Sequence, residues 1–149
     1  MVEKIAIKET KKGLGLFSNC RIGAEEVIFL FERNFVASPT NITLRIDEHL
    51  HQLSTDPTLP ENFLNHSCEP NSYIDFENLS LRAHRDIERG EEITYDYCTS
   101  DWDGEDTFEC MCASSTCKKY IAGFKNLSSL EKQVIIRFAS PFLKRNYVQ

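Results

Sequence analysis

The sequence predicts an α+β chain that is mainly β and ends in a helix. Short runs of β-prone or alternating apolar residues recur through the first hundred residues, separated by Gly, Pro, Asn and Asp. Near the C-terminus the spacing becomes helical, beginning with an S-x-x-E pattern at Ser128–Glu131. A chain of 149 residues with 41% hydrophobic residues can bury one substantial core.

The first strands follow from local patterns. Glu3–Lys8 alternates charged residues with isoleucine, which predicts a strand with one buried face. Lys11–Gly15 is a glycine-rich turn, and Leu16–Asn19 is a short strand. Arg21–Glu25 turns the chain into Val27–Phe31, a continuous apolar and β-prone run that predicts a buried strand.

The segment Asn34–Pro60 has weak periodicity and scattered Pro, Asn, Asp and Ser. We expect a mostly irregular insert with one short strand near Thr43–Ile46. His49 and His51 lie here at a spacing of two, as metal ligands can, but no partners are nearby. We therefore interpret both as solvated polar residues.

A hairpin is predicted next, with arms at Ser72–Phe76 and Leu79–His84. In the second arm Leu81 and Ala83 point inward, so His84 points to solvent. After a turn, the run GEEITYDY at Gly90–Tyr97 predicts a strand whose two tyrosines share a face.

An acidic, glycine-containing loop is expected at Trp102–Thr107. The capping box then opens a helix over Ser129–Ala139, which buries three apolar residues at helical spacing: Leu130, Val134 and Phe138. Pro141 stops or kinks this helix, and Phe142–Tyr147 forms a short second turn.

Charge and composition limit the function. The net charge of −6 gives no basic face for nucleic acid, so no direct nucleic-acid binding is expected, whereas an acidic surface favours basic peptides. No apolar run reaches the roughly 20 residues of a membrane span, and Met1–Thr10 does not resemble a signal peptide. We expect an intracellular protein, cytoplasmic or nuclear, in which cysteines bind metal or remain free thiols.

Three cysteines, Cys110, Cys112 and Cys117, lie within eight residues in the run CMCASSTC. A structural zinc site needs four thiolate or imidazole ligands in a tetrahedron, so one more ligand must come from elsewhere. Free surface thiols are the alternative.

Four motifs occur in order along the chain: KGLGL at Lys12–Leu16, NHSCEPN at Asn65–Asn71, GEEITYDY at Gly90–Tyr97 and CMCASSTC at Cys110–Cys117. Together they resemble the donor-binding, catalytic and post-SET zinc motifs of the SET-domain lysine methyltransferases. The resemblance spans most of the chain. It implies a SET-domain fold of several small sheets, with a knot-like arrangement in which the GEEITYDY segment threads beside the NHSC strand.

The resemblance also implies an activity: transfer of methyl groups from S-adenosylmethionine to a lysine side chain of a protein or peptide, giving mono- or dimethyl product. Tyr97 matches the tyrosine that orients the amine and methyl group, and Tyr95 matches the position that tunes the methylation state. The matching donor-binding residues are Lys12, Gly13, Leu14, Asn65, His66 and Tyr120. Trp102 is an alternative to Tyr120 as the aromatic cover of the adenine.

Cys68 of NHSC matches the family's fourth zinc ligand, which would tie the C-terminal segment to this loop. Cys98 is a competing ligand, and Cys20 is interpreted as a packing residue. The expected division is a SET core at 1–102, a post-SET zinc segment at 103–122 and a helical extension at 123–149. No cysteine-rich region precedes Cys68, and the short insert leaves a histone substrate in doubt.

Two other functions fit parts of the sequence. One is a catalytically silent SET module that binds peptides, against which the intact Tyr97, Asn65 and His66 argue. The other is a zinc-ribbon interaction protein, which would leave GEEITYDY and KGLGL unexplained.

Overall fold

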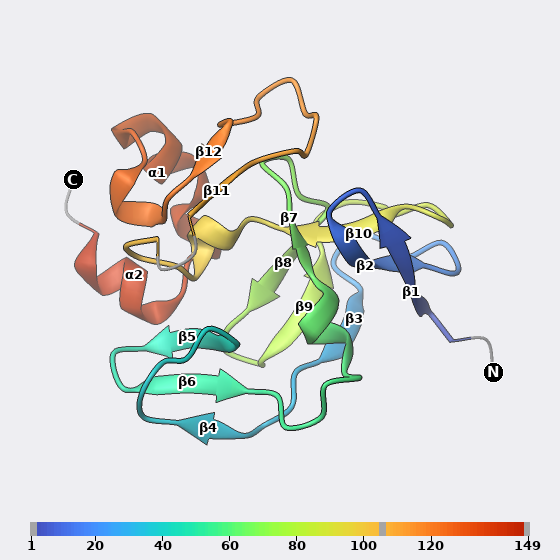
Figure 1. Ribbon diagram of the computed structural model, residues 1–149, viewed down its shortest axis with the longest axis horizontal. Coiled ribbons are helices and arrows are strands. Elements are labelled where there is room, and N and C mark those ends of the chain that lie inside the picture. Colours follow the sequence, from blue (N-terminus) through green and yellow to red (C-terminus); the bar gives the residue numbers. More distant parts are fainter. Residues whose placement is uncertain (1–2, 105–106, 148–149) are drawn as a thin grey trace.

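The computed structural model describes residues 3–104 and 107–147. Short strands in several small sheets surround the core, and short helices gather at the C-terminal end (Figure 1). This arrangement confirms the predicted mainly β fold with a C-terminal helix.

The sheet that carries the motifs has four strands in the order β1-β2-β10-β7. They are β1 (Ile5–Thr10), β2 (Gly13–Ser18), β10 (Glu92–Tyr95) and β7 (Asn65–His66). β10 pairs antiparallel with β2 and parallel with β7, with Thr94 opposite Asn65 and Tyr95 opposite His66. The predicted placement of the GEEITYDY segment beside the NHSC strand is therefore correct.

The turn between β1 and β2 is shorter than expected. Only Lys11 and Lys12 turn, and the glycines predicted to extend the turn belong to β2, where Gly15 pairs with Lys8. A Cβ atom on Gly15 would lie 2.7 Å from the Glu92 carboxylate and 2.9 Å from the Asn65 amide. A side chain at this position would therefore displace both polar groups.

A second sheet has the order β3-β9-β8 and contains β3 (Val27–Leu30), β9 (Ser80–Ala83) and β8 (Ser72–Asp75). β8 and β9 form the predicted hairpin, with Leu81 and Ala83 buried and His84 exposed. The buried strand predicted at Val27–Phe31 is confirmed in part: β3 forms there with Ile28 and Phe31 buried, but Leu30 is 69% exposed.

The insert forms a third sheet: the short strand predicted near Thr43–Ile46 is confirmed, but the two further strands that pair in this sheet were not predicted. Its strands are β4 (Phe35–Val36), β5 (Thr43–Asp47) and β6 (Leu50–Leu53), in the order β4-β6-β5. His51 lies on the central strand β6 and is completely buried, which also contradicts the interpretation of this residue as solvated. His49 is exposed as expected.

Short elements connect these sheets to the C-terminus. They are η1 (Pro60–Phe63), η2 (Tyr97–Thr99), the paired β11 (Phe108–Glu109) and β12 (Tyr120–Ile121), and η3 (Phe124–Asn126). Of the acidic loop expected at Trp102–Thr107, residues 105–106 lie outside the described residues.

The C-terminal helix begins as predicted but buries a different face. The side chain of Ser128 accepts from the Glu131 N–H, and the Glu131 carboxylate accepts from the Ser128 N–H, forming the capping box. α1 (Ser129–Ile135) then tightens into η4 (Ile136–Phe138), and Pro141 starts α2 (Pro141–Asn146). Leu130 and Val134 are 71% and 64% exposed, so the prediction that they face the core is wrong.

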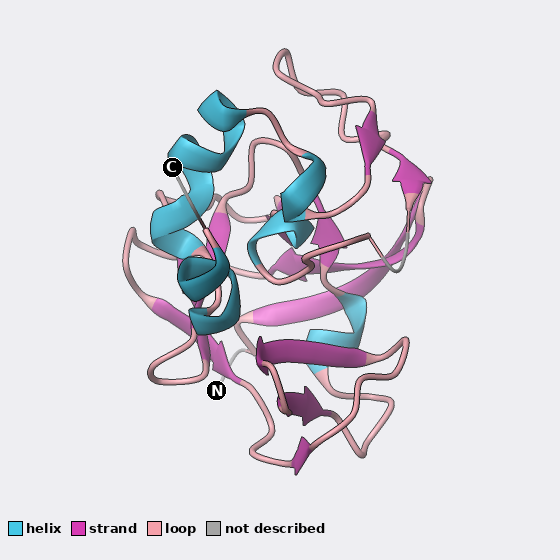
Figure 2. Cartoon of the chain, turned by 90° about the vertical axis from the view of Figure 1, so that its left-hand side faces the viewer, coloured by secondary structure: helices cyan, strands magenta, loops and turns pink. Residues whose placement is uncertain are grey.

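Two apolar clusters hold the molecule together. The larger cluster joins the three sheets and includes Leu16, Leu81 and Ile93. The smaller cluster packs Phe124, Ile135 and Leu143 under the C-terminal helices, which form one side of the molecule (Figure 2). Within the described ranges, none of the helices has the length and apolar character required to cross a membrane.

Candidate active site and metal centre

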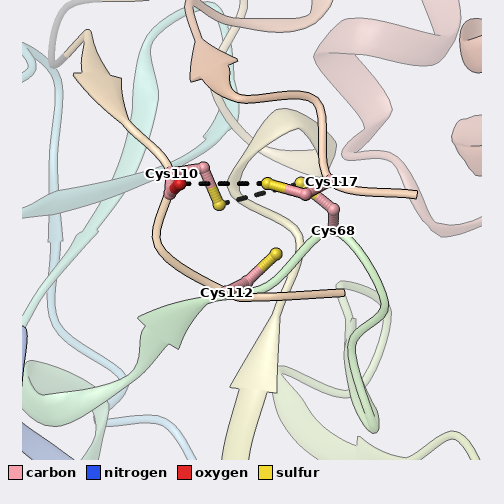
Figure 3. Close-up of side chains that lie close together, drawn as sticks. All are labelled: Cys68, Cys110, Cys112 and Cys117. Carbon is pink, nitrogen blue, oxygen red and sulfur yellow. Dashed lines mark hydrogen bonds between the residues drawn. The ribbon is translucent and has the colours of Figure 1, made fainter. Parts of the chain in front are cut away.

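Four cysteines from two distant segments converge at one point. The Sγ atoms of Cys68, Cys110, Cys112 and Cys117 all lie within 4.8 Å of one another (Figure 3). Zinc bound to four sulfurs at about 2.3 Å holds them roughly 3.8 Å apart, and the Cys68 and Cys110 sulfurs are 3.8 Å apart. The donor set therefore fits a structural zinc ion, with Cys68 as the fourth ligand.

The other two cysteines lie elsewhere. Cys98 is buried in the C-terminal apolar cluster, and Cys20 packs against the main core. Neither belongs to the cluster of cysteines, which removes Cys98 as the competing ligand.

Backbone groups support the sulfurs. The Lys118 N–H donates to the Cys68 Sγ at 3.3 Å, and the Lys119 N–H donates to the Cys117 Sγ at 3.4 Å. Donors of this kind orient and stabilise thiolate ligands. The cluster thus ties the segment that follows β11 to the loop that follows β7.

His66 connects the cysteine cluster to the tyrosines. Its Nδ1 accepts from the Tyr97 N–H at 3.1 Å, so the proton of the neutral ring lies on Nε2, which is 3.3 Å from the Cys68 Sγ. Burial lowers the pKa of His66 to about 4, although the nearby Asp96 opposes this shift. A neutral imidazole with both nitrogens engaged is suited to positioning and not to accepting a proton.

The two tyrosines lie side by side, although they do not share a strand. β10 ends at Tyr95, and Tyr97 begins η2, so the prediction of one continuous strand is wrong. The ring centroids are nevertheless only 4.9 Å apart. The Tyr97 hydroxyl donates to the Leu64 carbonyl oxygen at 2.5 Å, which fixes its orientation.

Tyr95 is a neutral phenol. Burial raises its pKa to about 12, and its hydroxyl oxygen lies 3.5 Å from the Ser100 Oγ. Phe108 of β11 completes the aromatic surroundings, with its ring centroid 5.8 Å from that of Tyr97. Nothing in the sequence pattern marked Phe108, because it follows an acidic loop and not a motif.

The expected donor-binding residues meet near Glu92, at the start of β10, whereas Tyr95 lies at its end. This region is called the Lys12–Asn65 edge. The Asn65 amide donates to the Leu14 carbonyl at 3.1 Å, and the Lys12 ammonium lies 3.5 Å from the His66 carbonyl. Both side chains also contact Glu92, whose carboxylate oxygens lie 2.8 Å from the Asn65 Nδ2 and 3.6 Å from the Lys12 Nζ. The sequence reasoning missed Glu92 as the residue that links these two groups, although it lies within GEEITYDY.

The backbone at Gly13 and Leu14 is open to solvent. Gly13 has φ +101°, a conformation that favours glycine, and a Cβ atom built there would meet nothing within 4 Å. Leu14 is 49% exposed. The backbone is thus accessible beside an amide, an ammonium group and the His66 carbonyl.

The two aromatic residues considered for the adenine cover differ in their packing. Tyr120 on β12 is 56% exposed, and its contact with a donor stays a prediction. The Trp102 ring stacks on Phe124 at 5.9 Å and meets Phe142 edge-on at 6.1 Å. Trp102 therefore packs within the C-terminal apolar cluster.

Comparison with known families gives this geometry its context. The family model described as SET domain matches residues 13–98, which is more than half of the chain. The chain belongs to the SET-domain family. The match includes both tyrosines and every residue of the Lys12–Asn65 edge apart from Lys12, which lies one residue before the matched range.

Curated relatives carry related names. A protein of Caenorhabditis briggsae named "Probable histone-lysine N-methyltransferase set-23" is 39% identical over 95 residues, which cover 54% of this chain and 39% of that protein. "Histone-lysine N-methyltransferase, H3 lysine-4 specific" of Emericella nidulans is 32% identical over 129 residues, covering 72% of this chain and 11% of that protein. This SET-domain chain therefore spans well under half the length of these relatives.

Solved structures share the fold. The methyltransferase domain of human histone-lysine N-methyltransferase SETMAR matches with a TM-score of 0.61 at 23% identity, covering 80% of this chain and 58% of that one. KRYPTONITE in complex with mCHG DNA and SAH matches with a TM-score of 0.66 at 23% identity, covering 78% and 28%. At this identity the likeness concerns the SET fold alone.

Proposed function

We propose that this protein transfers methyl groups from S-adenosylmethionine to the side-chain amine of a lysine in a protein or peptide, giving mono- or dimethyl product. The observation that supports this most directly is the Tyr97 hydroxyl, oriented by the Leu64 carbonyl and adjacent to Tyr95. Family membership and the names of the curated relatives point the same way.

The donor site in this proposal consists of Lys12, Gly13, Leu14, Asn65 and the backbone of His66, with Tyr120 as the cover. S-adenosylmethionine, when bound, supplies a sulfonium methyl group that an amine can attack directly. Asn65 and Lys12 are held in place by Glu92 and would contact the donor through their side chains. The chain thereby restricts the direction from which the amine can approach.

Tyr97 aligns the reacting groups. Because its hydroxyl proton is directed at the Leu64 carbonyl, its oxygen is oriented as an acceptor for the amine N–H and the methyl C–H groups. The substrate lysine would lose its proton to water, and its neutral nitrogen, oriented by Tyr97, would then accept the methyl group that the bound donor supplies. Alignment of this kind contributes up to about 7–11 kcal/mol in well-oriented systems.

Zinc in the proposal is structural. The ion at Cys68, Cys110, Cys112 and Cys117 would hold the segment carrying Tyr120 against the NHSC loop, next to His66. The division into a core at 1–102, a zinc segment at 103–122 and an extension at 123–149, and an intracellular location, belong to the same proposal.

Direct assay tests the function. The protein is incubated with isotope-labelled donor and with lysate or histones, since the curated relatives are named for histone lysine, and the products are mapped by mass spectrometry. Labelled methyl-lysine is expected with the unmodified chain and not with Tyr97→Phe. Donor binding in calorimetry without labelled product in either mixture would support the silent peptide-binding module instead.

A further inference from the structure

The C-terminal helix α2 lies outside the region that matches the SET family model, which ends at residue 98. It packs directly against β5 of the insert sheet (Figure 1). β5 in turn forms part of the wall of a cavity of about 330 Å³, and the lining of this cavity also includes Tyr95 and Tyr97. The position of α2 therefore bears on the shape of the space beside the tyrosine pair.

An ion pair joins α2 to the end of β5. The Arg145 Nη1 donates to the Asp47 Oδ2 at 2.8 Å, and the Arg145 Nη2 donates to the Asp47 Oδ1. Two parallel hydrogen bonds between a guanidinium and a carboxylate fix the orientation of the two groups as well as their distance. The hydrogen bond from Arg145 also lowers the pKa of Asp47, so both partners are charged near neutral pH.

Phe142 forms a second link between α2 and the cavity wall. The Arg45 guanidinium lies 4.7 Å from the Phe142 ring centroid, and the Trp102 ring meets Phe142 edge-on at 6.1 Å. Arg45 belongs to β5 and Trp102 to the segment after η2, and both line the cavity. Phe142 thus contacts two parts of the wall that come from distant regions of the chain.

The stability of the fold does not account for the ion pair. The Arg145 and Asp47 side chains are 56% and 33% exposed, and exposed ion pairs contribute little to the free energy of unfolding. The fully buried Leu143 already anchors α2 in the C-terminal apolar cluster. The ion pair is better explained by the place at which it holds β5.

We propose that Arg145 is a positioning residue, which acts through Asp47 to hold β5 in a fixed place relative to Tyr95 and Tyr97 and so sets the affinity for the lysine-containing substrate. The inference rests on the proposed function, because it takes the space beside the tyrosine pair as the place where the target lysine enters. Among the described residues that line the cavity, none belongs to the Lys12–Asn65 edge. Loss of the ion pair should therefore weaken substrate binding and leave donor binding unchanged.

Charge reversal tests the ion pair. Arg145→Asp places two carboxylates side by side, and the double variant Arg145→Asp/Asp47→Arg restores an ion pair with the charges exchanged. The probe is a fluorescein-labelled peptide pool with one central lysine in a degenerate sequence, and its binding is measured by anisotropy. Arg145→Asp should weaken peptide binding by about fivefold or more, because repulsion replaces the attraction of an exposed ion pair. The double variant should restore the binding.

Kinetics and hydrogen exchange distinguish positioning from a general loss of structure. In Arg145→Asp, KM for the peptide pool should rise while kcat stays nearly unchanged, as for a loss of uniform binding. The donor affinity in calorimetry should also stay unchanged. Hydrogen exchange of the β5 amides should become faster in Arg145→Asp and return to its original rate in the double variant.

Lys144→Asp is the matched control, because it makes the same change of charge on the same helix. Lys144 is exposed and forms no ion pair with any residue of the described ranges. This variant should keep the peptide affinity and the exchange rate of β5. Arg145→Asp and Lys144→Asp should unfold at similar urea concentrations.

The outcomes separate the two proposals. If Arg145→Asp binds and methylates the pool like the unmodified protein, the inference is overturned while the proposed function stands. Weaker binding that the double variant does not restore, or that Lys144→Asp shares, would also overturn the inference. Weaker binding that the double variant restores, without methylation of any peptide, would support the inference and contradict the proposed function. If the pool neither binds nor is methylated, both proposals fail.

Discussion

The Lys118 ammonium lies 3.3 Å from the Asp96 carboxylate, and the two side chains are only 12% and 3% exposed. Asp96 stands between the two tyrosines in sequence, and its carboxylate also caps η2 by accepting from the Cys98 N–H. Lys118 directly follows the last cysteine of the cluster. The ion pair thus joins the zinc segment to the turn that carries Tyr97.

Removing one partner of the Lys118–Asp96 pair should destabilise the fold more than removing both. Although burial opposes the shift, Asp96 raises the pKa of Lys118 above its ordinary value. Removal of one partner from a buried pair leaves an uncompensated charge, at a cost of about 3–5 kcal/mol. Lys118→Met should therefore lower the free energy of unfolding by this amount in urea titration, and the double variant Lys118→Met/Asp96→Asn should recover most of it.

Lys119→Met is the control for this prediction, because Lys119 is exposed and directly follows Lys118. It should change the stability little. Equal effects of the two lysine substitutions would show that the buried pair has no special role.

The cysteine cluster predicts about one zinc ion per chain. Cys110→Ser should lose the metal and weaken donor binding together, because the segment that the metal holds carries the proposed adenine cover. Metal analysis and calorimetric donor titration measure the two effects. Cys20→Ser, which lies outside the cluster, should retain zinc, and a metal-free protein with full activity would contradict the prediction.

We expect the Tyr97 hydroxyl to affect turnover and not donor binding. Tyr97→Phe should keep the fold and the donor affinity but lower kcat by about 10²-fold or more, because misalignment of the reacting groups alone has effects of this size. Asn65→Ala should act in the opposite order and weaken donor affinity first. Stopped-time assays and calorimetry on both variants distinguish them, and unchanged turnover in Tyr97→Phe would remove Tyr97 from its assigned role.

The pH profile should follow the substrate. A free lysine has a pKa near 10.4, so its neutral fraction and the turnover should rise about tenfold per pH unit from pH 7 toward 9. Neither His66 nor Tyr95 should change its protonation state between pH 7 and 9, because burial lowers the pKa of His66 to about 4 and raises that of Tyr95 to about 12. A maximum near pH 6.5 would instead indicate a histidine base.

Tyr95 predicts the methylation state. Its hydroxyl lies 3.5 Å from the Ser100 Oγ, so the two groups are placed to hold an ordered water beside the proposed position of the substrate amine. A second or third transfer would displace that water without replacing its hydrogen bonds, which is unfavourable. Tyr95→Phe should therefore shift the product toward di- and trimethyl-lysine with little change in the first transfer.

Intact-peptide mass spectrometry measures this shift, and Tyr73→Phe is a matched control because Tyr73 lies on β8 and bonds to Glu25. Predominant trimethylation by the unmodified protein that does not change in Tyr95→Phe would exclude the water argument.

The sequence predicted the local hairpin and, through its motifs, the family. It did not predict how distant side chains pack together. Ser72–Asp75 and Ser80–Ala83 pair as expected because the turn and the alternation are local signals. The convergence of Cys68 with the later cysteines was available only through the resemblance, because the two segments are far apart in sequence. Glu92 and Phe108 were missed because their roles depend on which side chains the fold brings to them.

The errors have identifiable physical causes. The insert strands pair with one another through backbone hydrogen bonds despite weak alternation, and this pairing buries His51 on the central strand. The helix was assigned the wrong face because helical spacing alone does not show which face packs: α1 turns Ile135 into the C-terminal apolar cluster, and Leu130 and Val134 are left exposed. The tyrosine strand ends early because the Asp96 carboxylate caps η2.

The parallel pairing of β7 with β10 has a consequence for how the protein is made. Each partner strand is supplied by a segment about thirty residues from the other, and the last cysteine of the cluster follows more than twenty residues later. Contacts of such long range form slowly. A nascent chain can therefore pair β1 with β2 before β7 and β10 meet, and its four-cysteine cluster cannot be complete until Cys117 has been synthesised.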